Sequence, residues 1–378
     1  MLLSSLALRG FVPFNRRSLA ASISRAVNVG ADGIGEKTPS ASRSKFVIPL
    51  SSNADLALKY TTVHGGVRIG RLVEDIDAFG AGVAYNHCDG FAESRPLTVV
   101  TASFDKMSLL GRLRADLDIE LAGQVTYVGS SSMEVFVTAA NRTPAGEILA
   151  TAFEAKTTMV AREAFAKRPA RVHRLTPETD DERTLMSLGK ANAERRRQHS
   201  LAALTDIPPT TEEVALIHDL FKLRRNSTLS SFSFVSLEST RQKSFTLMHP
   251  ETRNIHGNVF GGLIMRHGFE LAYTTANLFF GSKPQLTCID EVHFVHPIGI
   301  GSICSMDAVV CFKERNSIVV RVEVSVIDPG SGRKDTTNLL FVTFHTRADE
   351  RLADLMPHTY EEAILMLEGR RKMQSSSR

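Results

Sequence analysis

The feature that most constrains the fold of this chain is a short motif that occurs twice. Segment 64–70 reads HGGVRIG and segment 256–262 reads HGNVFGG, so the two copies lie 192 residues apart. Four of the seven positions are identical without a gap. Similar elements are expected around both copies, which indicates that one structural unit is used twice within the 378 residues.

A long helix is predicted directly after each motif. The apolar stripe in the first copy consists of Leu72, Ile76, Phe79 and Val83. The stripe in the second copy consists of Met265, Phe269, Ala272, Ala276 and Phe280. Spacings of three and four residues place each set on one helix face. Glu74 lies nearly opposite the first stripe and we expect it to be solvated, whereas Asp77 lies ~125° from that stripe, on a flank.

Strands are predicted after each helix, in runs rich in Val, Ile, Thr and Phe. The runs of the first copy are 97–104, 119–128, 133–140 and 148–160, and those of the second are 285–295, 303–312, 318–327 and 336–346. A further strand is expected before each motif, at 59–63 and 232–247. One long helix followed by an antiparallel meander implies an α+β fold in which a sheet wraps around a central helix.

The repeat divides the chain into four expected segments. They are a leader at 1–31, an N-terminal domain at 55–163, a helical linker at 164–230 and a C-terminal domain at 231–370. Thr210 and Glu213 form a capping-box pattern in the linker, and Thr359 and Glu362 form another near the C-terminus. A third helix start is expected at Thr176-Pro177.

The positive charge of the chain is concentrated in the leader. Residues 1–31 carry four arginines and no acid, whereas the whole chain has a net charge of +4. The rest of the chain is therefore neutral, which argues against nucleic-acid binding. A basic, Ser-rich, acid-free leader is typical of an organelle transit peptide. The mitochondrial matrix is the expected destination, and another organelle and a disordered tail are the alternatives. No run of ~18 apolar residues occurs, so stable membrane insertion is not expected.

The composition also limits the chemistry. None of the four cysteines forms a C-x-x-C pair, which indicates neither a zinc ribbon nor a disulfide scaffold. His293 and His296 lie near Glu291, but their odd spacing on a strand makes them a poor metal pair. No H-E-x-x-H, G-x-S-x-G or P-loop motif occurs. We therefore expect neither a metal nor a cofactor.

The segments around both motifs resemble the hotdog fold, and two copies in one chain resemble the double-hotdog acyl-CoA thioesterases of the mitochondrial type-9 branch. The matching segments are 249–255, 260–262, 265–266 and 270–272 in the second copy, with 70–78 and 132–135 in the first. The resemblance covers about residues 60–370. It implies hydrolysis of fatty acyl-CoA to free fatty acid and coenzyme A. It also implies a homo-oligomer, a trimer of double-hotdog chains.

Gly261 and Gly262 open the second predicted helix and are candidate substrate-binding residues. A helix N-terminus offers free backbone N–H groups and a partial positive charge, and glycine lets a ligand approach them closely. These amides are thus candidates for an oxyanion hole. The alternative is that the glycines merely allow the helix and the sheet to touch.

The resemblance assigns the catalytic pair. In this family one hotdog supplies an Asn before its helix, and the partner hotdog supplies a carboxylate within its helix. These slots hold Asn254 of the second copy and Asp77 of the first. The equivalent residues, Thr62 and Phe269, predict that the mirror site is inactive. Asp77 would act as a general base toward water or as a nucleophile, and Asn254 would orient the water or the carbonyl.

Three weaker candidates and two other functions remain. His256 and Asn258 are candidate lining residues, although His64 repeats His256 and a shared turn role explains both. Glu270 adjoins the vacated carboxylate slot, and pairing with Arg266 is its alternative role. A hotdog hydratase would usually carry an Asp followed five residues later by a His, which this chain lacks. A non-catalytic acyl-CoA sensor would need no base.

Overall fold

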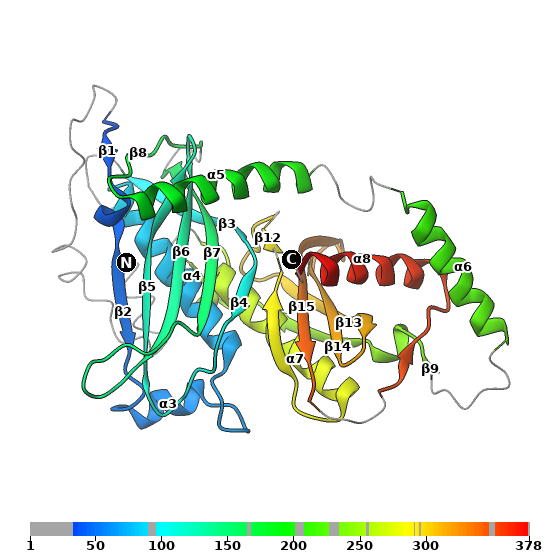
Figure 1. The fold of residues 1–378 in the computed structure, drawn as a ribbon. Coiled ribbons are helices and arrows are strands. Elements are labelled where there is room, and N and C mark those ends of the chain that lie inside the picture. Colours follow the sequence, from blue (N-terminus) through cyan, green and yellow to red (C-terminus); the bar gives the residue numbers. More distant parts are fainter. Residues whose placement is uncertain are drawn as a thin grey trace. The chain divides into compact units, whose positions relative to one another are not determined.

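The structure is a computed structural model, and it describes residues 33–89, 96–164, 168–200, 208–226, 234–254, 257–290, 292–294, 296–347 and 352–376. The chain forms two compact units (Figure 1). The first unit comprises Met1–Ala193, Met248–Arg266 and His293–Gly301. The second comprises Glu194–Leu247, His267–Val292 and Ser302–Arg378. The leader lies outside the described residues.

The first copy of the repeat forms a strand-rich unit around one long helix. Its elements are β1 (Glu36–Lys37), η1 (Pro39–Ser42), β2 (Ser44–Ile48), α3 (Ala54–Tyr60), α4 (Ile69–His87), β3 (Leu97–Phe104), β4 (Met107–Leu109), β5 (Asp118–Val128), β6 (Ser132–Arg142), β7 (Phe153–Glu163), β8 (Arg174–Leu175) and α5 (Asp180–Ser200). Its sheet has the antiparallel order β2-β5-β6-β7, and β3 and β4 both pair with β7.

The second copy repeats nearly the same order after a linker helix. Its elements are α6 (Thr211–Asn226), β9 (Phe234–Val235), η3 (Glu238–Thr240), β10 (Gln242–Leu247), η4 (Pro250–Thr252), α7 (Gly261–Phe280), β11 (Gln285–Ile289), β12 (Val292–His293), β13 (Ile303–Glu314), β14 (Ser317–Ile327), β15 (Lys334–His345), β16 (Asp354–Leu355) and α8 (Tyr360–Ser376). The sheet order is β10-β13-β14-β15-β11, again antiparallel.

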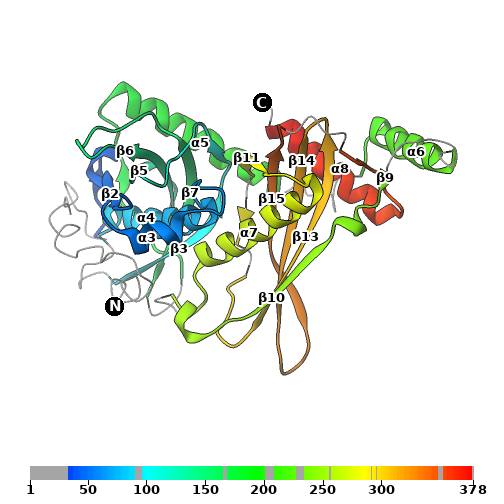
Figure 2. The same cartoon turned by 90° about the horizontal axis from the view of Figure 1, so that it is seen from below.

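The two central helices confirm the spacing of the repeat, because α4 begins at Ile69 and α7 begins 192 residues later at Gly261. Every residue of both predicted apolar stripes is buried. In the first unit α4 contacts β3, β5, β6 and β7, and the sheet curves around it (Figure 2). This is the hotdog arrangement, and its tandem occurrence confirms the predicted fold class. Among the described residues, no helix is long and apolar enough to cross a membrane.

The turn before each central helix is built in the same way. Thr62 Oγ1 accepts a hydrogen bond from the Gly66 N–H at 3.0 Å, and Asn254 Oδ1 accepts one from the Asn258 N–H at 3.1 Å. Each turn also contains a glycine with a positive φ, at +73° for Gly65 and +84° in the second copy. Only glycine adopts this conformation without strain, which explains why the motif repeats a glycine there.

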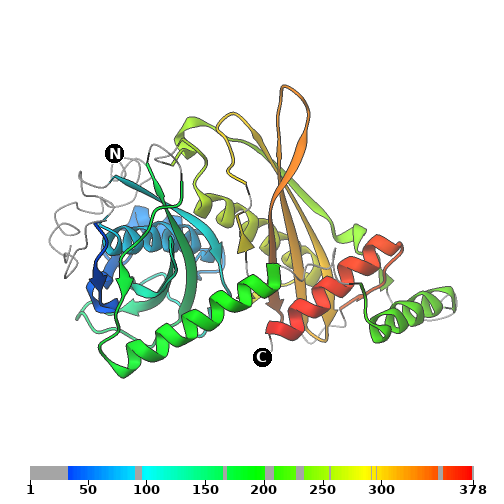
Figure 3. The same cartoon turned by 90° about the horizontal axis from the view of Figure 1, so that it is seen from above.

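The helix α5 packs on the strands of the first unit, as α8 packs on those of the second (Figure 3). Both helices approach the sheet through a glycine. A Cβ atom added at Gly189 would lie 2.5 Å from Tyr127 Cβ, and one added at Gly369 would lie 2.6 Å from Phe312 Cβ. Neither position leaves room for a methyl group.

We expect Gly189→Ala to lower the free energy of unfolding by about 1–2 kcal/mol, because overpacking outweighs the better helix propensity of alanine. Ser187→Ala on the exposed face of the same helix is the control, with a change within about 0.5 kcal/mol. Urea unfolding of both variants measures the difference. A Gly189→Ala variant as stable as the parent would contradict this close contact.

Two of the three predicted helix starts are confirmed. The Thr210 N–H donates to Glu213 Oε2 while the Glu213 N–H donates to Thr210 Oγ1, and Thr359 caps α8 through the Glu362 N–H. The third start, at Thr176-Pro177, is wrong by a few residues. Its capping oxygen belongs to Thr179, which accepts from the Glu182 N–H at 3.2 Å, and α5 begins at Asp180.

Some strand predictions were also wrong. Residues 59–63 form the end of α3 and the following turn, because Asn53 caps a helix through the Leu56 N–H. The strand that precedes the motif is β2 instead, and the short strand β4 was missed. The expected strand at 148–160 begins only at Phe153.

Candidate active site

Asp77 lies on α4 in the middle of the first unit, and its side chain is nearly inaccessible to solvent, with 1% of the residue exposed. Thr101 of β3 donates its hydroxyl to Asp77 Oδ1 at 2.7 Å. The backbone N–H of Gly262, in the first turn of α7, donates to Asp77 Oδ2 at 2.6 Å. The first copy of the repeat thus supplies a buried carboxylate, and the second copy supplies a helix N-terminus that contacts it.

Burial raises the pKa of Asp77 to about 6, because the carboxylate is removed from water. The hydrogen bonds from Thr101 and Gly262 act in the opposite direction, and the negative charge of Glu74 raises the pKa further. A carboxyl group with this pKa is ionised at neutral pH and is still basic enough to accept a proton. These are the properties required of a general base.

The two glycines at the start of α7 permit this close approach. A Cβ atom at Gly262 would lie 2.9 Å from the Glu74 backbone oxygen and 3.0 Å from Asp77 Cβ. A Cβ atom at Gly261 would lie 3.4 Å from Asp77 Oδ2 and 3.2 Å from the ring of Phe294. The glycine pair therefore lets the start of α7 pack closely against α4 and Asp77. The alternative role, in which the glycines allow the helix to contact the sheet, does not apply to Gly262, because its near neighbours on the other element are residues of α4.

Aromatic rings surround this glycine pair. A ring carbon of Phe260 would lie 2.8 Å from a Cβ atom at Gly262. The ring of Phe294 lies next to Gly261, and its centroid is 6.3 Å from that of the fully buried Phe104. The carboxylate thus borders an apolar environment, in which a charge interacts more strongly than it would in water.

The loop before α7 carries the remaining predicted site residues. Asn254 and Asn258 are bonded to each other twice, because the Asn254 N–H donates to the Asn258 carbonyl oxygen at 2.6 Å in addition to the side-chain bond described above. Asn254 therefore shapes the turn, as Thr62 does in the first copy. His256 lies outside the described residues.

Glu74 is not solvated as predicted: only 3% of the residue is exposed. Its Oε2 atom accepts from Arg71 Nη1 at 2.9 Å and from Arg266 Nη1 at 3.1 Å. The helix α4 is covered by the sheet on one side and by the start of α7 on the side that holds Glu74. The face opposite the apolar stripe is therefore an interior face lined with ion pairs.

A second buried carboxyl group lies next to this cluster. Asp75 is fully buried, and the Tyr60 hydroxyl of α3 donates to Asp75 Oδ2. Burial raises the pKa of Asp75 to about 7, although the charge of Arg71 acts in the opposite direction. Asp75 and Asp77 are two residues apart on α4, so their side chains leave the helix on nearly opposite sides. The hydrogen bond from Tyr60 to Asp75 joins α3 to α4.

Asp75→Asn is expected to become more stable relative to the parent as the pH rises from about 4 to 7. The pKa of Asp75 rises from 3.8 to about 7 on folding. The stability that protonated Asp75 gives the folded parent is therefore fully present at low pH and is lost as the pH rises through about 7. An asparagine cannot ionise and keeps the neutral state. Urea unfolding of both proteins between pH 4 and pH 8 measures this trend.

Asp116→Asn serves as the control for that experiment, because the pKa of the exposed Asp116 is lowered by Arg114. The stability of Asp116→Asn relative to the parent should change little over this pH range, and in the opposite direction. A stability difference between Asp75→Asn and the parent that is constant across this pH range would contradict the prediction.

The position equivalent to Asp77 in the second copy is aromatic. Phe269 packs against Tyr273 and Phe344, with ring centroids 6.4 Å and 6.0 Å away. The side chain offers no acid or base, and its surroundings form part of the core of the second unit. The two copies therefore differ at this position, where one holds a carboxylate and the other an aromatic ring.

Thr101 was missed by the sequence analysis. It lies in an ordinary strand run, and no local signal marks its contact with Asp77. Within the described part of the chain, no group of three or more His, Cys, Asp or Glu residues could hold a metal ion. All four cysteines are buried and free.

Comparison with known proteins gives a consistent result. The chain is 34% identical to human mitochondrial acyl-coenzyme A thioesterase 9 over 355 residues, which covers 92% of this chain and 80% of the relative. It is 31% identical to the chloroplastic acyl-coenzyme A thioesterase 2 of Humulus lupulus, over 88% of this chain and 80% of that protein. No family model matches the chain.

Among solved structures, a putative oleoyl thioesterase from Lactobacillus plantarum aligns with 81% of this chain and 96% of its own length, at 9% identity and a TM-score of 0.49. The curated relatives extend over nearly the whole chain, including both copies of the repeat and the linker. The chain is therefore a thioester hydrolase of the double-hotdog type and belongs to the acyl-coenzyme A thioesterase family, in the branch of the mitochondrial type-9 and type-10 enzymes.

Proposed function

We propose that this chain hydrolyses acyl-CoA thioesters to a free fatty acid and coenzyme A, with Asp77 as the general base. The observation that carries the proposal is the buried carboxylate of one repeat copy held against the helix N-terminus of the other. Family membership supports the substrate class. The raised pKa of Asp77 supports the role of a base at neutral pH.

In the proposed reaction, Asp77 removes a proton from a water molecule as the water oxygen attacks the thioester carbonyl carbon. The negative charge then moves from the carboxylate to the carbonyl oxygen. The N-terminus of α7 stabilises negative charge in both states, because its N–H groups and dipole point to this place. The Gly262 N–H, which binds the carboxylate in the free enzyme, can then bind the oxyanion, together with the Gly261 N–H.

The second step breaks the bond between the carbonyl carbon and sulfur. The tetrahedral oxyanion collapses to the carboxylic acid and expels the thiolate of coenzyme A. The protonated Asp77 returns its proton to the leaving sulfur, which restores the carboxylate and balances the reaction. If Asp77 instead attacked the carbonyl directly, a mixed anhydride would form, and added hydroxylamine would trap it as a hydroxamate.

The loop before α7 completes the proposed site. Asn254 would orient the water or the carbonyl group, and His256 and Asn258 would line the substrate. The turn that Asn254 and Asn258 share supports this, because it fixes the loop that leads into Gly261. The mirror site, with Thr62 and Phe269, would be inactive.

The relatives also support a place for the enzyme. The type-9 and type-10 relatives are mitochondrial proteins, and we propose the mitochondrial matrix for this chain, with residues 1–31 as the transit peptide. We also propose a homo-oligomer made of three double-hotdog chains. Sedimentation velocity of the full chain tests this, since a monomer would contradict it.

The proposed activity is tested by release of free thiol from acyl-CoAs of short, medium and long chain length. We expect stoichiometric release of thiol and acid. Loss of enoyl-CoA absorbance without thiol release would identify a hydratase instead. Binding of acyl-CoA without any turnover would identify a non-catalytic sensor.

A further inference from the structure

Residues 74 and 266 occupy the same position in the two copies of the repeat, and they contact each other. Arg266 Nη1 lies 3.1 Å from Glu74 Oε2, and the two residues are 192 positions apart. Both side chains are largely shielded from solvent, with 4% of Glu74 and 22% of Arg266 exposed. If the two copies were identical, two side chains of the same charge would face each other at this position. Because the two copies differ in sequence within one chain, one can carry a glutamate there and the other an arginine.

A second guanidinium group completes the cluster. Arg71, one turn before Glu74 on α4, contacts the same Oε2 atom at 2.9 Å. One buried carboxylate therefore interacts with an arginine from each copy. Removing a partner from a buried carboxylate is costly, so the cluster holds the start of α7 against α4.

The same stretch of α4 holds the catalytic contact. The Glu74 backbone oxygen lies against Gly262, and the Gly262 N–H donates to Asp77. Arg266 follows Gly262 by about one helical turn on α7. The ion pair and the amide hydrogen bond are thus adjacent contacts between the same two helices.

We propose that Glu74 and Arg266 are positioning residues for the hydrolysis proposed above, and that their ion pair holds the Gly262 amide against Asp77 and balances the charge beside it. The inference rests on that proposed function. The inference adds one requirement to that function: the two copies must carry opposite charges at the position held by Glu74 in the first copy and Arg266 in the second.

The charge balance around Asp77 makes the proposal specific. From β3 and α7 its hydrogen-bond partners, Thr101 and Gly262, are uncharged. The charged group that acts on Asp77 is Glu74 of α4. Glu74 in turn contacts Arg71 of α4 and Arg266 of α7. Glu74 raises the pKa of Asp77, whereas the two arginines offset the charge of Glu74.

Two substitutions should therefore shift the acid limb of the kcat–pH profile in opposite directions. Glu74→Gln removes the like charge, so the limb should move to lower pH by about 0.5 unit. Arg266→Met leaves Glu74 less compensated, so the limb should move to higher pH by about the same amount. Both variants should lower kcat about tenfold through misplacement of the amide, with little change in KM. Arg266→Lys should restore the parent limb.

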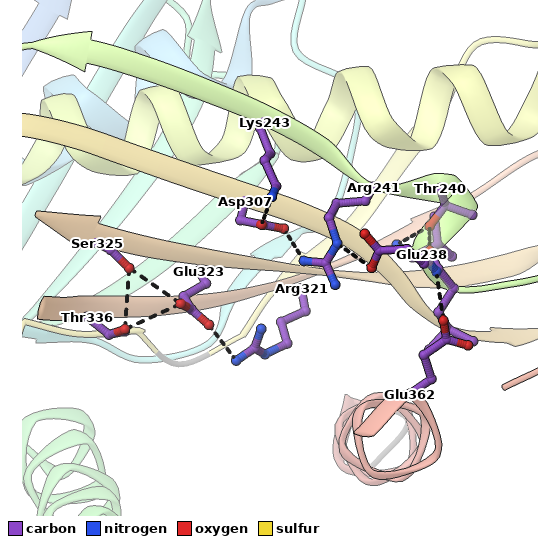
Figure 4. A network of polar contacts seen from close by, with 12 residues as sticks. Glu238, Thr240, Arg241, Lys243, Asp307, Arg321, Glu323, Ser325, Thr336 and Glu362 are labelled. Carbon is purple, nitrogen blue, oxygen red and sulfur yellow. Dashed lines mark hydrogen bonds and ion pairs between the residues drawn. The ribbon is translucent and has the colours of Figure 1, made fainter. Parts of the chain in front are cut away.

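Arg241 of the second unit provides a matched control. It lies between Glu238 and Asp307, with 23% of its side chain exposed (Figure 4). Arg241→Met should therefore disturb folding stability as Arg266→Met does, because both remove an arginine that is equally shielded. It should leave kcat and the acid limb unchanged. Equal kinetic effects from both arginine variants would overturn the proposal.

A readout without substrate separates this proposal from the proposed function. In protein labelled with ¹⁵N-glycine, the Gly262 amide signal should titrate with Asp77, and Asp77→Asn assigns it by removing that titration. Its midpoint should move to lower pH in Glu74→Gln and to higher pH in Arg266→Met. Midpoints that do not move, or that move in the same direction, would overturn the positioning role. Absence of thiol release by the parent would instead refute only the proposed function.

Discussion

Asp77→Asn is expected to lower kcat for acyl-CoA hydrolysis by about 10³-fold, which is the usual contribution of a positioned general base. Asparagine has nearly the same shape and can keep both hydrogen bonds of Asp77. Its carbonyl oxygen can accept from Gly262, and its amide can donate to the hydroxyl of Thr101. The variant should therefore fold and bind substrate, and KM should change little. The loss should come from the missing proton acceptor.

The matched control is Asp75→Asn, which changes an equally buried aspartate on the same helix. Asp75 contacts Tyr60 rather than the start of α7, so kcat should stay within about twofold of the parent. Thiol release with saturating acyl-CoA measures both variants. Turnover by Asp77→Asn near the parent rate would move the base elsewhere, and Glu270 would be the next residue to test.

Gly262→Ala should produce the second largest effect, a loss of about 10²-fold in kcat. Its new methyl group would lie 2.9 Å from the Glu74 backbone oxygen and 3.0 Å from Asp77 Cβ, so neither neighbour can rotate away. The start of α7 would have to move, and the amide would leave its place against the carboxylate. Such displacement of an oriented group weakens catalysis more than it weakens binding.

Gly268→Ala on the same helix is the control for this prediction. Its new methyl group would lie 2.9 Å from Leu340 Cδ2, the end of a flexible side chain that can adjust. We expect kcat of Gly268→Ala to equal that of the parent. A Gly262→Ala variant with parent kcat would show that the close approach of the helices has no catalytic role.

The repeat and the position of its helices could be predicted because they depend on local chemistry. The turn before each helix needs a glycine at positive φ and a side-chain oxygen that caps the loop, and both copies kept these residues. The apolar stripes needed only the helical period. Residue type and spacing therefore fixed the start of α4 and α7.

The contacts at the site could not be predicted in the same way. The hydrogen bonds of Asp77 come from residues 24 and 185 positions away in the sequence. The position of Asp77 on a helix flank suggested that another element could pack there, but it did not identify Thr101. The resemblance selected Asp77 and Asn254, and the geometry supports a turn-forming role for Asn254.

The error at Glu74 has a clear physical cause. A single apolar stripe suggests one buried face and one solvated face, whereas α4 is enclosed on both. The polar residues on the second interior face form ion pairs. In the sequence, such a face has the same pattern of polar residues as a face exposed to solvent. The contact with Arg266 from the second copy identifies this face as an interior one.

The pH dependence of kcat/KM for acyl-CoA hydrolysis by the full chain tests the central claim most directly. The proposed mechanism requires ionised Asp77, so we predict a fall in activity as the pH drops through about 6, the raised pKa of this carboxyl group. The residual activity of Asp77→Asn should lack this limb. An acid limb near pH 4, or one that persists in Asp77→Asn, would contradict the assignment of Asp77 as the base.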